Sequence, residues 1–475
     1  MLFKPAAASN NDNTNQAEDR KPRYKALKLF NVDLFARCDE ASAKGWIRPT
    51  ESGGTLYPVT CLDHSAQMLT AQPIILNPDG SIWKEGTLFL LNAVLDDEDT
   101  DPETIMAMAG HLADFMQTLA TEDRSFLDFS GYRFERPSYI YKEKFKLPIQ
   151  KGSTSTGTAN GKIRTIIKFY RYLMESRNFT PKNPPWKIKH STFKFEDAYG
   201  YERTKHVIHT DLTYPTIKTS SLGNYICDDG KLTPLTKYEQ EVLLQSLIEI
   251  GHPEMLLVFI IALVTGMRIQ TILTLRVSSL QKNAIASFDL IPIRAGRGSV
   301  VDTKRDKPQT IQMPAWLHHK LNIYVNSERF AQRRNKSQPQ PPGADYIFVS
   351  NTGMPYYIAK CDRHKYESTE KGSYVRSFIA KYLKPKILEH GCDLNFSFHD
   401  LRATFGMNLV EERREMLNRG KINMLQLVDY VRKRMNHSSS KTTQEYLNFQ
   451  QDREMLYQAD YDYQQHILEM WRDKL

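Results

Sequence analysis

Apolar residues recur at helical spacing through much of the first half of the chain. The apolar positions of residues 105–119 and 163–174 repeat every three or four residues, which predicts two amphipathic helices. Asp101 precedes a proline and is typical of a helix start, so we expect the first helix to begin there. Earlier in the chain, residues 73–91 contain apolar runs on both sides of Pro-Asp-Gly at 78–80. That pattern predicts a β-hairpin.

The second half of the chain combines helices with short strands. Residues 236–250 and 253–264 predict two helices, and the proline that begins the second one is tolerated in a first turn. Short β-like runs follow at 284–293 and 310–313, with further helices after them. The stretch 329–343 is rich in basic residues, Gln and Pro, and predicts a flexible basic loop. The chain is therefore expected to be mainly α-helical with a small β component.

The same pattern divides the chain into parts. A length of 475 residues predicts two to four domains, at roughly 100–200 residues per domain. The first residues are polar and Asn-rich, and a second polar, irregular stretch precedes the helices of the C-terminal half. We expect a disordered arm at 1–24, a mixed N-terminal extension of unknown role at 25–100, a helical domain at 101–190, a linker at 191–231 and a C-terminal domain at 232–475.

Composition narrows the class of protein and its compartment. The 64 Lys and Arg outnumber the 55 Asp and Glu, and the net charge of +9 favours an anionic partner such as nucleic acid. The longest apolar run, 255–264, is too short to span a bilayer core of about 30 Å. The N-terminal residues lack the apolar core of a secretory signal. Five scattered cysteines without a CxxC pair fit a reducing cytosol, so we expect a cytoplasmic protein without membrane contact.

Four short segments in the last third of the chain carry charged or nucleophilic side chains. They are TGMR (265–268), DTKRDK (302–307), FHDLR (398–402) and NHSSSKTTQEY (436–446). Alone, each has an ordinary explanation: a salt-bridge arginine, a solvated lysine-rich hairpin tip, a chance His-x-x-Arg and a packed tyrosine. His399 and Arg402 are three residues apart, so they share one face if the segment is helical.

Together and in this order, the four segments resemble the tyrosine recombinase (phage integrase) superfamily. The resemblance covers 232–475 well, through VTGMRIQTILTLR, TKRDKPQTIQMP, FSFHDLRATFG and RMNHSSSKTTQEYLNF. It reaches loosely into 101–190, which looks like the helical core-binding domain of that family. The resemblance implies a mainly α catalytic domain with a small β-sheet (α+β), whereas residues 1–100 match nothing that we can place.

The resemblance also implies a reaction: cleavage and rejoining of DNA through a 3′-phosphotyrosyl bond, without metal, ATP or another cofactor. Tyr446 would be the nucleophile, and its ordinary pKa of about 10 allows it both to attack and to leave again. Arg268 and Arg402 would clamp the scissile phosphate, since a guanidinium stays charged and donates bidentately to phosphate oxygens. Fixed positive charge would then meet the negative charge of the transition state.

The remaining site residues carry the proton transfers in the family. Lys304, the first lysine of the turn, would donate a proton to the 5′-oxygen, and Lys307 is its rival for that role. His399 would transfer a proton with the tyrosine, and His437 would donate a hydrogen bond to a phosphate oxygen. An acidic residue often stands three positions after the first arginine in this family. Here that residue is Thr271, which leaves open how Arg268 and its neighbours are braced.

The implied partners are double-stranded DNA and further copies of the chain, two to four in a synapse. A sister recombinase or an accessory protein could join them, and the protein would lie with the nucleoid when bound. A basic face on the predicted helix 163–174 could follow the DNA backbone, although a merely solvated face is the ordinary alternative. Its residues are Lys162, Arg164, Lys168 and Arg171.

Several alternatives stay open on the sequence alone. The same site would suit a type IB topoisomerase-like or a telomere-resolvase-like enzyme. A non-catalytic DNA-binding accessory protein could also keep the fold. The amphipathic tail 466–475 could pack on its own domain or on a neighbouring copy. A zinc site is not expected, since Cys61/His64 and His206/His209 have no companion pair, and no phosphate-binding GK[S/T] loop is present.

Overall fold

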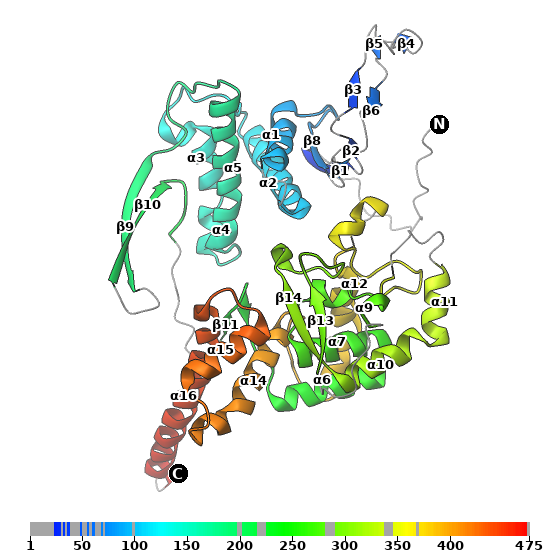
Figure 1. The fold of residues 1–475 in the computed structure, drawn as a ribbon. Coiled ribbons are helices and arrows are strands. Elements are labelled where there is room, and N and C mark those ends of the chain that lie inside the picture. The colour runs from blue at the N-terminus through cyan, green and yellow to red at the C-terminus, as the bar shows by residue number, and fades with distance from the viewer. Residues whose placement is uncertain are drawn as a thin grey trace. The chain divides into compact units, whose positions relative to one another are not determined.

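The chain forms two compact units, residues 1–217 and 218–475, which are described separately. The computed structural model (Figure 1) describes residues 23–29, 72–96, 100–196, 202–215, 225–280, 290–336, 345–366 and 370–472, with short strand pieces between 32 and 69. The fold is mainly helical with small two-stranded sheets, as the sequence pattern predicted. No helix among these residues is both long and apolar enough to cross a membrane.

The first unit begins with a series of short antiparallel ladders. β1 (Lys25–Leu29) pairs with β8 (Gln72–Leu76) over five residue pairs. Three shorter pairs nest inside this one along the sequence, β2 with β7, β3 with β6 and β4 with β5, in the manner of one long hairpin. The short strands are Val32–Asp33, Ala36–Cys38, Arg48–Pro49, Thr55–Leu56, Val59–Cys61 and Met68–Leu69.

Helices form the rest of the hydrophobic core of this unit. Leu112, Phe115 and Phe169 are fully buried in it, and the predicted helix start at Asp101 is confirmed, because its side chain accepts from the Glu103 N–H. Residues 1–22, most of the expected disordered arm, lie outside the described residues. The helices are α1 (Lys84–Leu95), α2 (Pro102–Thr121), α3 (Pro137–Glu143), α4 (Lys146–Gln150) and α5 (Thr156–Ser176).

The expected hairpin at 73–91 is only half right. The turn forms, with Gly80 at a φ of 86° and a single bridge between Leu76 and Ile82. The second strand does not form, because the chain enters α1 directly after the turn. Helical geometry places Phe89 in the core, where its ring meets the Phe169 ring edge-on at 5.6 Å.

The stretch expected as an irregular linker holds a long β-ribbon. β9 (Ile188–Glu196) and β10 (Glu202–Thr210) pair antiparallel over nine residue pairs. The base of the ribbon is held by Asp211, whose buried carboxylate accepts from the Lys187 N–H and the Tyr139 hydroxyl at 2.9 Å each. Asp211 lies 72 residues from Tyr139 in the sequence, so a local sequence pattern does not predict the ribbon.

The second unit contains the largest hydrophobic core. It opens with a small hairpin of β11 (Ile226–Cys227) and β12 (Lys231–Leu232), and α7 lies in its centre and packs against α14. The predicted helices at 236–250 and 253–264 are confirmed as α6 (Lys237–Ile250) and α7 (Pro253–Thr265). The remaining α-helices are α8 (Ile269–Leu273), α9 (Val277–Leu280), α10 (Ala315–Val325), α11 (Glu328–Lys336), α12 (Ser373–Phe378), α13 (Lys384–Glu389), α14 (Asp400–Asn418), α15 (Met424–Met435) and α16 (Ser440–Arg472).

Two paired strands pack against this core and are joined by a turn. β13 (Leu290–Ala295) pairs antiparallel with β14 (Gln309–Pro314), near both strands that the sequence predicted. The start of the first predicted strand, 284–289, lies outside the described residues. Alternate residues of β13 are buried, as expected for a strand with one face on a core.

The predicted basic loop at 329–343 is wrong in its first part, which forms α11. Phe330 is buried, and the fully buried Glu254 carboxylate accepts from Arg329 at 2.8 Å and pairs with Arg333 at 3.0 Å. A buried carboxylate needs such partners, and the α-helix supplies both from one face. Residues 337–344 lie outside the described part of the chain.

Candidate active site

Arg268 follows a sharp turn at the end of α7. Gly266 ends that helix at a φ of +64°, in the left-handed region that glycine adopts without strain. A Cβ there would lie 2.3 Å from the Phe405 ring, so the close packing also requires glycine. Arg268 then stands directly before α8, with its side chain one-quarter exposed.

Arg402 is held from three sides at the start of α14. Its side chain is 2% exposed, and Nη1 donates to the Gly266 carbonyl at 2.7 Å. Nη2 donates to the Met435 carbonyl at 2.6 Å, and Nε donates to Asp228 Oδ2 at 2.9 Å. The guanidinium therefore joins the ends of α7 and α15 to a carboxylate from the β11–β12 hairpin. His399 is the residue before α14, one helical turn from Arg402, as the spacing predicted.

His437 and Tyr446 lie on either side of the α15–α16 junction. Asn436 caps the C-terminus of α15 with a φ of 54°, and His437 follows with its Nδ1 3.0 Å from Thr443 Oγ1 on α16. Tyr446 is fully buried, and its ring rests on α14, where a Cβ at Gly406 would lie 2.4 Å from it. The predicted nucleophile thus has a fixed ring and a hydroxyl turned toward the other site residues.

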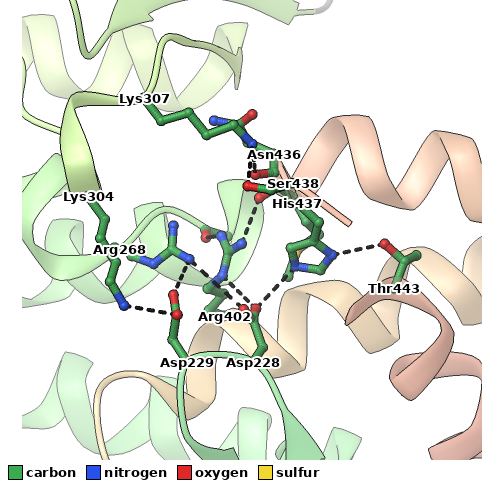
Figure 2. Close-up of polar contacts among 12 residues, drawn as sticks. Asp228, Asp229, Arg268, Lys304, Lys307, Arg402, Asn436, His437, Ser438 and Thr443 are labelled. Atoms are coloured by element: carbon green, nitrogen blue, oxygen red, sulfur yellow. Dashed lines mark hydrogen bonds and ion pairs between the residues drawn. The ribbon is translucent and has the colours of Figure 1, made fainter. Parts of the chain in front are cut away.

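The two lysines of the β13–β14 turn have different partners. Figure 2 shows Lys304 reaching toward Asp229, with Nζ 2.9 Å from Oδ1. Lys307 donates to the Asn436 carbonyl at 2.8 Å and to Ser438 Oγ at 3.3 Å, next to His437. The turn therefore brings one lysine to each side of the site.

Two carboxylates that the sequence reasoning missed connect these side chains. Asp228 and Asp229 form the tip of the β11–β12 hairpin, in the stretch expected to be a linker. Asp228 Oδ2 accepts from Arg402, from His437 Nε2 at 3.1 Å and from the Tyr446 hydroxyl at 3.0 Å. Asp229 Oδ2 accepts from Arg268 at 2.6 Å, and Asp228 Oδ1 lies 3.9 Å from the same Arg268 nitrogen.

Only a weak signal in the sequence marks these carboxylates. An Asp-Gly pair between short apolar runs is a hairpin turn signal, and it indicates a turn without indicating what the turn touches. Thr271, at the position where the family often has an acid, is buried in α8. The braces of Arg268 therefore come from Asp229 and Asp228, about 40 residues earlier in the chain.

Burial and charge set the protonation of the site. Burial opposes ionisation of Asp228, but the hydrogen bond from His437 and the charge of Arg402 hold the pKa of its carboxyl well below the ordinary range. Burial, with the Asp228 charge, raises the pKa of Tyr446. Burial and the nearby Arg402 charge lower the pKa of His399, and burial lowers that of His437 despite the opposite pull of Asp228. Near neutral pH, the site holds an ionised Asp228, a neutral tyrosine and two neutral histidines.

The predicted basic face of α5 is only partly available. Arg164, Lys168 and Arg171 are exposed at i, i+4 and i+7, along one face of the helix. Lys162 does not join them, because its Nζ pairs with Asp114 Oδ2 on α2 at 3.0 Å. Within the described ranges, His, Cys, Asp and Glu form no group of three or more that could hold a metal ion.

The second unit matches a known protein family over most of its length. Residues 235–453, slightly less than half of the chain, match the model of the phage integrase family. The carboxylates of Asp228 and Asp229 lie before the matched span. No curated protein matches the chain.

Several solved structures are similar to the chain at low identity. XerA recombinase is 16% identical, with 79% of this chain and 97% of that chain covered and a TM-score of 0.30. The Tn1549 transposon integrase in complex with circular intermediate DNA is 15% identical, with 76% of this chain and 94% of that chain covered and a TM-score of 0.41. A lambda integrase dimer bound to a COC′ core site is 11% identical, with 76% of this chain and 93% of that chain covered and a TM-score of 0.42.

Proposed function

We propose that this protein is a site-specific DNA recombinase, the integrase of a mobile element, which cuts and rejoins double-stranded DNA through Tyr446. The observation that carries the proposal is the convergence of Arg402, His437 and Tyr446 on one oxygen of Asp228, with Arg268 beside it. Donors that converge on one anionic oxygen in a buried site are suited to a phosphate oxygen as well.

Cleavage in the proposed reaction consists of two reversible steps, attack of the tyrosine on phosphorus and departure of the 5′-oxygen. The Tyr446 oxygen attacks phosphorus as its proton passes to His399, and the bond from phosphorus to the 5′-oxygen breaks. Lys304 donates a proton to the departing 5′-oxygen, with Lys307 as the alternative donor. The arginines neutralise the charge that develops on the phosphate oxygens, and His437 donates a hydrogen bond to one of these oxygens. Rejoining reverses both steps with a new 5′-hydroxyl, so the energy of the broken bond is kept in the phosphotyrosyl bond.

The rest of the chain has a proposed place in the same reaction. The helical part at 101–190 would bind the duplex as a core-binding domain, through the exposed basic face of α5. Strand exchange needs two cleaved duplexes, so the active assembly on DNA would contain two to four copies. Strand exchange between partners is what separates this function from topoisomerase-like relaxation by the same site.

Covalent trapping tests the proposal. The purified chain is incubated without metal, and with EDTA, on nicked DNA from the ends of its own element and then run on a denaturing gel. We expect a protein–DNA adduct that is absent from Tyr446→Phe, with Tyr461→Phe on the exposed part of α16 as the matched control. DNA binding without an adduct on authentic ends would contradict the proposal and favour a non-catalytic accessory role.

A further inference from the structure

The hairpin that carries Asp228 packs into the hydrophobic core of the second unit. Ile226 and Leu232, the second residue pair from the tip, are buried in the same hydrophobic cluster as Phe405 and Tyr446. The chain that follows is tied to α14, since the Thr233 N–H donates to Asp400 Oδ1 at 2.8 Å. Such an anchored tip has little freedom to move, so the Asp228 carboxylate keeps a fixed place.

Asp228 is bound as a shared acceptor. One oxygen, Oδ2, receives donors at 2.9 Å from Arg402, 3.1 Å from His437 and 3.0 Å from Tyr446, and the side chain is 4% exposed. Arg402 lies on α14, His437 in the turn between α15 and α16, and Tyr446 on α16, so a single carboxylate joins three separate parts of the fold. Figure 2 shows Arg402 and His437 directed at this carboxylate.

The contacts of Arg402 leave part of its guanidinium for a ligand. A guanidinium carries five N–H groups, and three of them are engaged by Asp228, Gly266 and Met435. Two N–H groups are left over after these contacts. Asp228 therefore orients Arg402 and leaves two of its N–H groups to bind a phosphate.

We propose that Asp228 is the positioning residue of the site: it fixes Arg402 for phosphate binding and holds the His437 imidazole and the Tyr446 hydroxyl until DNA arrives. This inference rests on the proposed function. Asp228 takes this positioning role from a hairpin that precedes the family-matched span, residues 235–453. The position three after Arg268, where the family often has an acidic residue, holds an uncharged threonine in this chain. Tyr446 exchanges its hydrogen bond to Asp228 for the attack on phosphorus.

Removing the charge of Asp228 separates positioning from binding. Asp228→Asn keeps the shape but leaves a weaker acceptor for three donors. We expect the adduct to form about 10–100-fold more slowly at saturating DNA, the range seen when a group that orients a ligand from behind is removed. The DNA concentration for half-maximal rate stays within about twofold, since Asp228 has no role in contacting the duplex. Glu239→Gln, at the N-terminus of α6 where a glutamine can also complete the capping box, is the matched control for loss of one acidic charge.

A titration without DNA tests the geometry independently of the reaction. The pKa of His437, followed by NMR on 13C-labelled histidine and assigned with His437→Asn, is expected to fall in Asp228→Asn because the carboxylate that raises it is gone. Asp228→Glu retains the charge beside buried Arg402 and serves if the asparagine variant does not fold. It is expected to cleave slowly as well, since the added methylene displaces the acceptor.

The outcomes separate this inference from the proposed function. A wild-type adduct with an unchanged rate in both Asp228 variants, or a His437 pKa that does not move, overturns the positioning role and leaves the recombinase proposal intact. A wild-type chain that forms no adduct overturns the recombinase proposal. In that case, a His437 pKa that falls in Asp228→Asn supports the shared-acceptor geometry by itself.

Discussion

Lys304 and Lys307 show how single residues of one turn acquire different chemistry. Lys304 is half exposed and pairs with Asp229, which also binds Arg268. Burial and the charges of Arg268 and Arg402 lower the pKa of Lys307, which favours proton donation, but its amine donates to the Asn436 carbonyl. Lys304 is paired with the same carboxylate as an arginine of the proposed clamp, and we therefore keep it as the proposed acid.

A modified substrate distinguishes the two lysines. Lys304→Ala is expected to slow cleavage by about 10²–10⁴-fold, the usual contribution of a general acid. DNA with sulfur in place of the 5′-bridging oxygen should restore the rate, because a thiolate leaves without a proton. The adduct on both substrates is measured by denaturing gel. Rescue of Lys307→Ala but not of Lys304→Ala would reverse the assignment.

At the level of elements, α11 depends on one buried charge. Glu254 begins α7 in the core and binds Arg329 and Arg333 of α11, and the Tyr324 hydroxyl donates to it at 3.1 Å. Burial opposes ionisation, but hydrogen bonds from His252 and Arg329 lower the pKa of the Glu254 carboxyl below its ordinary value of 4.5. Because the folded pKa is lowered, the stabilisation is complete above about pH 4.5 and is lost as the pH falls toward the folded value.

Glu254→Gln should therefore destabilise the chain and flatten its acid response. We expect the free energy of unfolding at pH 7 to fall by about 3 kcal/mol, since the change leaves two arginines facing an uncharged group. The difference from wild type should shrink as the pH drops below 4.5. Urea denaturation at several pH values measures both effects, with Glu415→Gln, at an exposed position near the end of α14, as the control. An equal loss at every pH would contradict this role of the charge.

The α5 face offers a second test at the scale of an element. Lys168→Ala removes an exposed charge from the Arg164–Lys168–Arg171 row and should lower the slope of log affinity against log salt by about 1. Lys162→Ala removes a charge that is already paired with Asp114, so the salt slope should stay the same. Fluorescence anisotropy with labelled duplex DNA measures both slopes. Equal slopes for wild type and Lys168→Ala would remove this face from the proposed interface.

At the level of the whole molecule, the end of α16 carries large apolar side chains that are exposed. Leu468 is 57% exposed and Trp471 is 64% exposed, although both are large and apolar. Exposed apolar side chains of this size on one helix end are typical of an interaction site. We expect this end of α16 to bind a neighbouring copy on DNA.

Substitution of the two side chains tests that expectation. The variant Leu468→Ser with Trp471→Ser should keep the wild-type unfolding temperature, because these side chains bury little area in their own chain. Complexes with two or more copies on one DNA should become fewer in mobility-shift and light-scattering measurements. A lower unfolding temperature with unchanged assembly would show that the tail packs on its own unit.

The sequence by itself determined most of the helices and the residues that are candidates for a chemical role. Helical periodicity and capping residues such as Asp101 and Thr236 act within a few positions, so a local pattern records them. The order of the four motifs in the last third of the chain was likewise enough to select the six candidate site residues from Arg268 to Tyr446.

Only the tertiary structure decided where the charges of the site are balanced. Asp228 meets Arg402 across 174 residues and Tyr446 across 218, and nothing local to an Asp-Asp-Gly turn specifies those partners. The β9–β10 ribbon and α11 were missed for the same reason, because the contacts that stabilise them, from Asp211 to Tyr139 and from Glu254 to Arg329, join distant parts of the chain. A buried carboxylate must find its donors wherever the fold brings them, and the sequence pattern records only neighbours within a turn or two.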